Sequence, residues 1–370
     1  MKQVQLVLVG GFLGAGKTTL LAQAATHLVA QGKRVGLITN DQATDLVDSG
    51  LLRQEGLQVG EVAGGCFCCR FNDLVAAADK LMTELKPDIL MGEPVGSCTD
   101  LAATVIRPMQ ALHGDWFKVA PFTVLTDPGR LREALAEGGS ASFPDNVLYI
   151  YRKQLEEADL IVVNKLDQIT PAAAAELQQA VASKYPGTRV LAISAQTGTG
   201  VDQWLDAVLS GSNAGRRQIP VNYDTYADGE AVLGWLNAGV TLEAGLPTDW
   251  AAFVRGYLAL LHADLKARSA EIAHLKLLLT TPSGSLVANL TSTAGTPSFR
   301  GDTGPLASNA SLTVNARVHM SPDDLRAAVE AALAKAAASA QCRVNVLQIQ
   351  SFRPGRPQPT HHMGGTTEAL

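Results

Sequence analysis

Three cysteines stand within four residues of one another, in a stretch that reads Glu-Val-Ala-Gly-Gly-Cys-Phe-Cys-Cys-Arg. They are Cys66, Cys68 and Cys69, and the chain of 370 residues holds only 5 cysteines. In a reducing compartment a tight thiol cluster is more typical of metal binding or redox chemistry than of structural disulfides. Three interpretations stay open: a metal site, a redox dithiol with the Cys-x-x-Cys spacing, and buried small side chains.

The spacing of the thiols favours a metal site. In an extended stretch the side chains of Cys66 and Cys68 point the same way, and a turn at Phe67 or Cys68 brings Cys69 round to join them. Three thiolates leave one tetrahedral position for water, for a ligand from another protein or for a fourth residue, with Cys98 as one candidate. Sulfur ligands suit Zn²⁺ and Co²⁺ alike, so the sequence predicts a transition metal of that class.

A phosphate-binding loop follows the first apolar run of the chain. Gly-Phe-Leu-Gly-Ala-Gly-Lys-Thr matches the full motif in its required setting between a strand and a helix. Backbone N–H groups of such a loop surround phosphates, the lysine reaches the β and γ oxygens, and the Thr18 hydroxyl binds Mg²⁺. The predicted loop residues are Gly11, Gly14, Ala15, Gly16, Lys17, Thr18 and Thr19.

Two later segments predict the nucleotide base. Asn164, Lys165 and Asp167 form an Asn-Lys-x-Asp motif at the end of an apolar run. A carboxylate at Asp167 accepts both the N1–H and the exocyclic amino hydrogens of guanine, whereas adenine offers no such pair of donors. Ser194 and Ala195 follow another apolar run and are expected to hold the guanine oxygen. The pattern therefore predicts GTP and GDP as ligands.

Two acidic residues are candidates for the catalytic centre. Glu93 ends a third apolar run, where an acidic residue orients Mg²⁺ or its water in phosphate-loop proteins. Asp41 ends the second run and is a candidate for magnesium, a second metal or an attacking water, with a solvated loop aspartate as the alternative. The predicted catalytic residues are thus Lys17, Thr18, Glu93 and Asp41, with Thr18 and Glu93 on magnesium. Slow intrinsic hydrolysis is expected, because no evident base is present.

The elements that must position these residues alternate along the first half of the chain. Nearly continuous apolar runs alternate with segments of helical period, which predicts an α/β domain over residues 1–210, with a mostly parallel sheet and helices on both faces. A linker is expected at 211–232, a smaller α+β domain at 233–353, and a flexible tail at 354–370. In that tail, His361 and His362 are either solvated or a pre-collecting metal site.

Bulk composition limits the partners. The formal net charge is -5 and the charged fraction is 18%, which gives no reason to expect a nucleic-acid partner. The apolar start of the chain is interrupted by glycines and Lys17 before it reaches the length of a signal peptide or a membrane span. These features predict a cytoplasmic protein that does not bind membranes.

The motifs, taken in order, resemble those of the CobW family of GTPases, which are related to the urease and hydrogenase nickel-insertion GTPases. The resemblance lies in the phosphate loop, the Cys-x-Cys-Cys motif, Glu93 to Gly96 and the Asn-Lys-x-Asp motif, and covers about residues 3–210. It implies a GTPase metallochaperone that delivers a transition metal or a metal cofactor to a client metalloprotein or cofactor enzyme, and it allows a homodimer. The family usually has Glu where this chain has Asp41.

Two rival functions stay open at the level of sequence. A phosphate-loop kinase acting on a small molecule would transfer phosphate to an acceptor other than water, and it would not need the guanine motif. A non-catalytic metal sensor or scaffold would bind GTP without turning it over. A turnover assay separates the sensor from both enzymes.

Overall fold

The computed structural model describes residues 3–41, 52, 56–136, 142–211 and 214–364. They form two compact units. The first unit contains the described residues up to Gly229 and those from Arg356 onward, and the second contains Glu230–Gly355.

The first unit is built on an eight-stranded sheet. Its strands are β1 (Val4–Gly10), β2 (Val35–Asp41), β3 (Gln58–Ala63), β4 (Ile89–Glu93), β5 (Phe117–Val119), β6 (Thr123–Thr126), β7 (Leu160–Val163) and β8 (Arg189–Ala192). The order is β3-β2-β4-β1-β6-β7-β8, with β5 beside β1, and the described pairings are all parallel. Every residue of β4 and β7 is buried, which explains why these runs are apolar apart from Glu93 at the end of β4.

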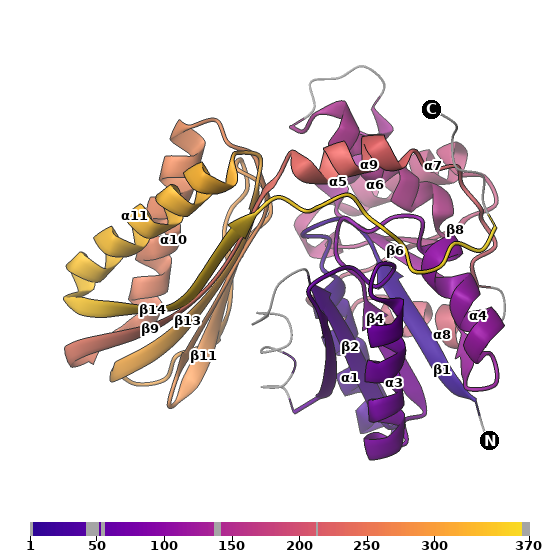
Figure 1. The fold of residues 1–370 in the computed structure, drawn as a ribbon, viewed down its shortest axis with the longest axis horizontal. Coiled ribbons are helices and arrows are strands. Elements are labelled where there is room, and N and C mark those ends of the chain that lie inside the picture. The colour runs from indigo at the N-terminus through magenta and orange to yellow at the C-terminus, as the bar shows by residue number, and fades with distance from the viewer. Residues whose placement is uncertain (1–2, 42–51, 53–55, 137–141, 212–213, 365–370) are drawn as a thin grey trace. The chain divides into compact units, whose positions relative to one another are not determined.

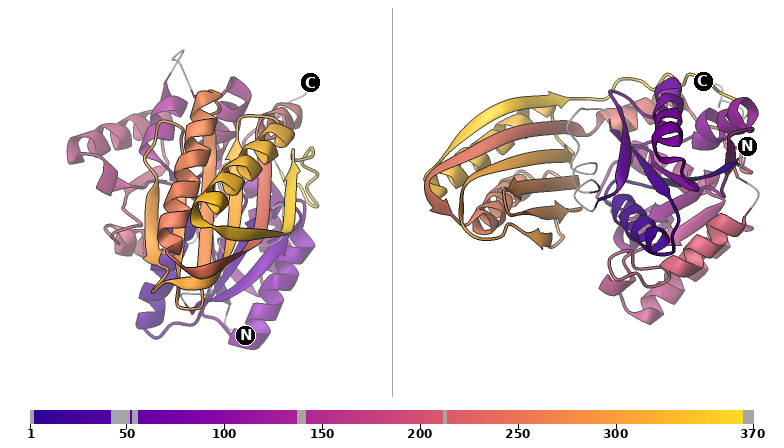
Figure 2. Two further views of the ribbon diagram at one scale, coloured as in Figure 1. Left: turned by 90° about the vertical axis from the view of Figure 1, so that its left-hand side faces the viewer. Right: turned by 90° about the horizontal axis from the view of Figure 1, so that it is seen from below.

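Helices cover both faces of this sheet, with α1 on one side and α3 on the other (Figures 1 and 2). They are α1 (Lys17–Ala30), α3 (Phe71–Leu85), α4 (Arg107–His113), α5 (Pro128–Leu135), α6 (Asp145–Glu157), α7 (Pro171–Lys184), α8 (Val201–Ser210) and α9 (Tyr223–Ala231). A π-helical turn at Ala102–Ile106 precedes α4, and a 3-10 turn spans Leu166–Gln168. The predicted α/β fold class is confirmed.

The second unit is a six-stranded sheet with two helices on one face, visible in the left view of Figure 2. Its elements are β9 (Gly234–Thr248), α10 (Trp250–Ala267), β10 (Ile272–Thr281), β11 (Gly284–Leu290), β12 (Ser298–Asp302), β13 (Ala307–Val318), α11 (Pro322–Ala340) and β14 (Cys342–Phe352). All its pairings are antiparallel in the order β12-β11-β10-β13-β9-β14. The expected α+β layer is therefore present.

The ends of the units differ from the predicted boundaries. The segment 211–232, expected to be a linker, contains α9, and the first unit continues to Gly229. Residues 354–364 belong to the expected flexible tail, but here they make hydrogen bonds to the first unit, while 365–370 lie outside the described residues. Composition alone does not reveal this, because polar and proline-rich chain is also suited to lying extended on a surface.

Candidate functional site

The predicted site residues gather at one edge of the parallel sheet. Parallel strands end at the same edge, and ligands of open α/β sheets bind there. The phosphate loop follows β1, the thiols follow β3, Glu93 ends β4, and Asn164 follows β7. Residues distant in sequence thus become neighbours because of the strand order.

Three glycines give the phosphate loop its shape. Gly11, Gly14 and Gly16 have φ values of 126°, 77° and 97°, which are unfavourable for other residues. A side chain at Gly11 would also lie 2.1 Å from the Leu125 carbonyl oxygen. The loop can therefore be built only with glycine at these positions.

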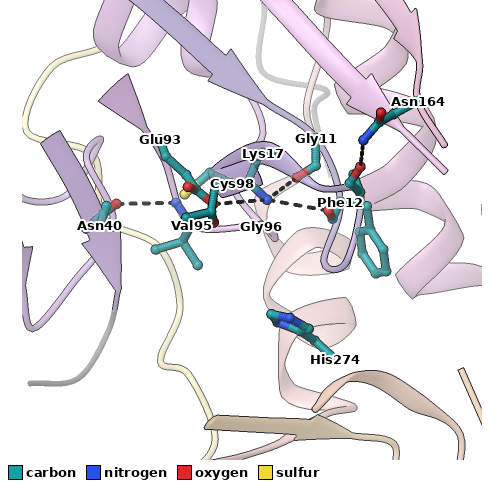
Figure 3. Close-up of polar contacts among 12 residues, drawn as sticks. Gly11, Phe12, Lys17, Asn40, Glu93, Val95, Gly96, Cys98, Asn164 and His274 are labelled. Atoms are coloured by element: carbon teal, nitrogen blue, oxygen red, sulfur yellow. Dashed lines mark hydrogen bonds and ion pairs between the residues drawn. The ribbon is translucent and has the colours of Figure 1, made fainter. Parts of the chain in front are cut away.

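Lys17 reaches back over this loop. Its Nζ donates to the carbonyl oxygens of Gly11 at 2.8 Å and Phe12 at 3.4 Å (Figure 3). The side chain is buried and lies 3.9 Å from Glu93 Oε1. A cation in this position is suited to the β and γ phosphates of a nucleotide.

Thr18 and Glu93 meet although 75 positions separate them in sequence. The Thr18 hydroxyl donates to Glu93 Oε1 at 3.2 Å, and both side chains are buried. A hydroxyl and a carboxylate at the start of a helix are hard oxygen donors of the kind that Mg²⁺ binds beside phosphates. The pair therefore fits the predicted magnesium site.

Asn164 connects the base motif to the phosphate loop. Its Nδ2 donates to the Ala15 carbonyl oxygen at 2.8 Å (Figure 3), and its Oδ1 accepts from the Ala195 N–H at 2.9 Å. A side chain at Gly16 would lie 2.5 Å from that Nδ2, so this glycine also makes room for Asn164. Three predicted segments are thereby tied together by one amide.

Asp167 lies beside Ser194, another residue of the predicted base site. The Ser194 hydroxyl donates to Asp167 Oδ1 at 2.5 Å. Lys165, in a left-handed conformation with φ 61°, pairs with Asp127 at 2.6 Å. Burial alone would raise the pKa of Asp127, but the Lys165 ammonium and two backbone N–H groups lower it overall.

The three thiols form one cluster. The Cys66 sulfur lies 2.9 Å from that of Cys68 and 3.1 Å from that of Cys69, and the last two are 3.8 Å apart. Zinc–sulfur bonds of about 2.3 Å place the sulfurs of a tetrahedral site about 3.8 Å apart. Zinc would thus require only a small separation of these side chains, so the residues fit the metal.

The three thiols of the cluster differ in pKa. Hydrogen bonds from Cys68, and then from Cys69 and Cys98, hold the pKa of Cys66 well below its usual range, although burial opposes this. The hydrogen bond to Cys66 raises the pKa of Cys68 well above its usual value and that of Cys69 to about 11. Cys66 is therefore the most acidic thiol of the group, and metal binding must displace the protons that the thiols carry.

Asn40 is a site residue that the sequence analysis missed. Its Nδ2 donates to the carbonyl oxygens of Val62 at 2.9 Å and Gly65 at 2.7 Å. Its Oδ1 accepts from the N–H groups of Phe67 at 2.8 Å and Val95 at 3.4 Å. One buried amide thus holds the thiol motif next to the segment that follows Glu93. The only signal in the sequence is a polar residue at the end of a buried strand.

Helix α6 was also absent from the predicted elements, although it supports the segment after Glu93. Gln154 Nε2 donates to the carbonyl oxygens of Gly96 at 3.0 Å and Cys98 at 2.8 Å. Glu157 accepts from Thr99 and from the Ala102 N–H. The helical spacing of apolar residues after Pro144 was the signal that could have revealed it.

Asp41, His361 and His362 are the remaining residues that the sequence analysis singled out. Asp41 ends β2, but its side chain lies outside the described residues. His361 packs edge-on against Phe71 with ring centroids 4.8 Å apart, and His362 Nε2 bonds Asp100 at 2.9 Å. The two histidines thus contact different residues of the first unit.

A parallel sheet with a phosphate loop and an Asn-Lys-x-Asp motif defines a phosphate-loop nucleotide-binding domain. The family model described as CobW/HypB/UreG, nucleotide-binding domain, matches residues 5–192. The chain therefore belongs to the CobW/HypB/UreG family, and the resemblance drawn from its motifs is confirmed.

Curated relatives are similar to part of this chain. The zinc chaperone YeiR of Escherichia coli is 33% identical over 180 residues, or 46% of this chain and 49% of that protein. The zinc chaperone CobW of Pseudomonas aeruginosa is 26% identical over 217 residues, or 50% of this chain and 55% of that protein. The chain spans about half the length of the curated relatives it matches.

Solved structures match this chain at low sequence identity and with TM-scores below 0.5. HypB from Helicobacter pylori in complex with nickel is 16% identical with a TM-score of 0.41, and the match covers 56% of this chain and 86% of that one. The Zn(II)-bound YjiA GTPase from E. coli is 16% identical with a TM-score of 0.37, over 90% of this chain and 99% of that one.

Within the described residues, every helix is too short or too polar to span a lipid bilayer.

Proposed function

We propose that the protein is a GTP-hydrolysing metallochaperone, in which the nucleotide state controls the binding and delivery of a transition metal. One observation carries the proposal. Asn40 holds both the thiol motif, through Phe67, and the segment after Glu93, through Val95. A change near the γ-phosphate therefore has a direct structural route to the thiols.

The residues at the carboxyl edge of the parallel sheet support the proposed binding and hydrolysis of GTP. The loop N–H groups and Lys17 bind the phosphates, and Asp167 accepts the guanine hydrogens, with Ser194 and Ala195 next to it. Thr18 and Glu93 would hold Mg²⁺, which neutralises the charge that develops on the phosphates. Asp41 is kept as a candidate for orienting the attacking water.

The metal half of the function follows from Cys66, Cys68 and Cys69. Three clustered sulfurs are soft ligands that suit Zn²⁺ or Co²⁺. The names of the curated relatives, which are zinc chaperones, support zinc. A three-sulfur site leaves a position at which a client metalloprotein or cofactor enzyme can take over the metal. A cytoplasmic location and a homodimer remain predictions from the sequence.

The test combines GTP turnover with metal stoichiometry in the full chain. The wild type is expected to release inorganic phosphate from GTP and to bind one Zn²⁺ or Co²⁺ per chain. Replacing Cys66, Cys68 and Cys69 together by Ala should abolish metal binding, whereas the control Cys342→Ala, in the second unit, should not.

Three outcomes would contradict the proposal. Phosphate transfer to an acceptor other than water would indicate a kinase, and GTP binding without turnover would indicate a sensor or scaffold. Metal binding that persists in the triple variant would assign the three cysteines to another role, such as redox chemistry.

A further inference from the structure

A fourth cysteine lies next to the thiol cluster. Cys98 is 1% exposed, and its thiol lies close enough to the motif to help lower the pKa of Cys66 and raise that of Cys68. It comes from the segment that follows β4, not from the thiol motif. Four of the chain's 5 cysteines therefore meet at one place in the first unit.

The backbone around Cys98 is fixed from two sides. The Cys98 N–H donates to the Val95 carbonyl oxygen at 2.9 Å, and the Cys98 carbonyl oxygen accepts from Gln154 Nε2 at 2.8 Å. Val95 in turn donates to Asn40, the residue that also holds Phe67 of the thiol motif (Figure 3). The position of Cys98 beside the thiols is thus part of the same hydrogen-bonded framework.

We propose that Cys98 is a fourth sulfur ligand of the metal, an inference that rests on the proposed metal binding at Cys66, Cys68 and Cys69. Zinc favours four tetrahedral ligands, and a closed site of four sulfurs retains the metal better than an open site of three. The three motif sulfurs lie within 4.8 Å of one another, and Cys98 stands outside that group. Closing the site therefore requires the Cys98 side chain and its segment to move toward the three motif sulfurs.

The position of Cys98 in the segment after Glu93 links this fourth ligand to the nucleotide site. Glu93, which contacts Thr18, lies five positions before it in the same segment. A rearrangement at the γ-phosphate that moves this segment moves Cys98 with it. The site is then closed by four sulfurs while the metal is held, and it opens to three when a client receives the metal.

The test counts sulfur ligands directly. X-ray absorption of the Zn²⁺-loaded full chain should show four sulfurs at about 2.3 Å in the wild type, and three sulfurs with one lighter ligand in Cys98→Ala. The affinity for Zn²⁺, measured by chelator competition, should fall at least about tenfold in Cys98→Ala. Circular dichroism verifies that this variant is folded, and Cys342→Ala is the matched control that should keep four sulfurs.

The results separate this inference from the proposed function. A wild type with three sulfurs, or a Cys98→Ala variant with the sulfur count and affinity of the wild type, would overturn the role of Cys98 alone. A wild type that binds Zn²⁺ without sulfur would overturn both.

A second inference comes from Gln358–Met363, named here the C-terminal strap. Thr360 donates from its N–H to the Cys68 carbonyl oxygen at 2.9 Å and from its hydroxyl to that of Cys69 at 3.1 Å. The Met363 N–H donates to the Ala103 carbonyl oxygen at 2.9 Å. The strap therefore binds both segments that carry the sulfurs.

One contact of the strap reaches a sulfur itself. The Gln358 N–H donates to Cys69 Sγ at 3.2 Å, and Cys69 is the least buried thiol of the motif. N–H donors stabilise thiolate charge. We infer that this donor slows the loss of metal from Cys69, and that the strap must leave Cys69 before a client can receive the metal.

A pair of substitutions at one position tests the strap. Gln358→Pro removes the N–H, and its neighbours Pro357 and Pro359 already restrict the chain, whereas Gln358→Ala keeps the N–H. Zinc release to an excess of chelator should be about tenfold faster in Gln358→Pro and unchanged in Gln358→Ala. Equal release rates in the two variants would overturn the inference.

Discussion

The backbone N–H of Phe67 donates a hydrogen bond of 2.8 Å to the side-chain oxygen of Asn40. Phe67 stands between the first two thiols, and Asn40 is near the end of β2, so this bond fixes the thiol motif to the sheet. The same oxygen accepts from Val95, in the segment that begins at Glu93. Nucleotide and metal residues therefore share one structural support.

Replacing Asn40 should lower the stability of the protein and weaken the coupling between nucleotide binding and metal binding. Asn40→Ala removes four hydrogen bonds, three of them buried, and we expect the free energy of unfolding to fall by about 1–3 kcal/mol or more, because unpaired buried groups are costly. Asn40→Asp keeps the acceptor for Phe67 and Val95 but loses both donors. Urea unfolding measures the loss, and a wild-type midpoint in Asn40→Ala would refute the structural role.

Lys17→Ala should reduce GTP turnover on the order of 10²-fold or more, because a preorganised charge is removed from the phosphates. Without nucleotide the unfolding free energy should fall by about 1 kcal/mol or more, since the lost partners include the loop carbonyls of Gly11 and Phe12 and the buried Glu93 carboxylate. The control is Lys33→Ala, at an exposed position. Turnover of Lys17→Ala at the wild-type rate would exclude Lys17 from catalysis.

Asp167→Asn should change the preferred base. The substitution replaces one acceptor oxygen by a donor, so GTP should bind more weakly and xanthosine triphosphate, which has a carbonyl in place of the amino group, more tightly. Competition binding with both nucleotides measures the ratio. If the wild type binds ATP as tightly as GTP, the guanine assignment is wrong.

Glu157→Gln should make stability less dependent on pH. Burial raises the pKa of Glu157 well above its usual value, so the folded protein holds this proton to higher pH than the unfolded chain does. The stabilisation is complete below the unfolded pKa of about 4.3 and is lost as pH rises toward the folded pKa. Between pH 5 and pH 8, the free energy of unfolding of Glu157→Gln, measured by urea unfolding, should therefore rise relative to that of the wild type. A constant difference across that range would show that Glu157 is charged in the fold.

The sequence marked the candidate ligand-binding residues more clearly than the residues that hold them in place. Lys17, Thr18 and Glu93 belong to motifs whose residue types are set by phosphate and magnesium chemistry, and the structure brings them together. Asn40 and Gln154 bind backbone groups from other parts of the chain, and such partners become neighbours only through the strand order. No local pattern marks them.

The C-terminal strap illustrates a second limit. Its prolines and polar residues predict a flexible tail. The structure uses the same residues as an extended segment whose N–H groups pair with carbonyl oxygens of the first unit. Composition describes how such a segment behaves alone, but the surface that binds it depends on the rest of the fold.

The central claim is that nucleotide state and metal binding are coupled. It is tested most directly by measuring the Zn²⁺ affinity of the full chain against a competing chelator, with a non-hydrolysable GTP analogue, with GDP and without nucleotide. We expect the GTP-analogue form to bind Zn²⁺ about 5- to 150-fold more tightly than the GDP form, and Zn²⁺ to tighten binding of the analogue by the same factor. Equal Zn²⁺ affinities in all three states would contradict the account.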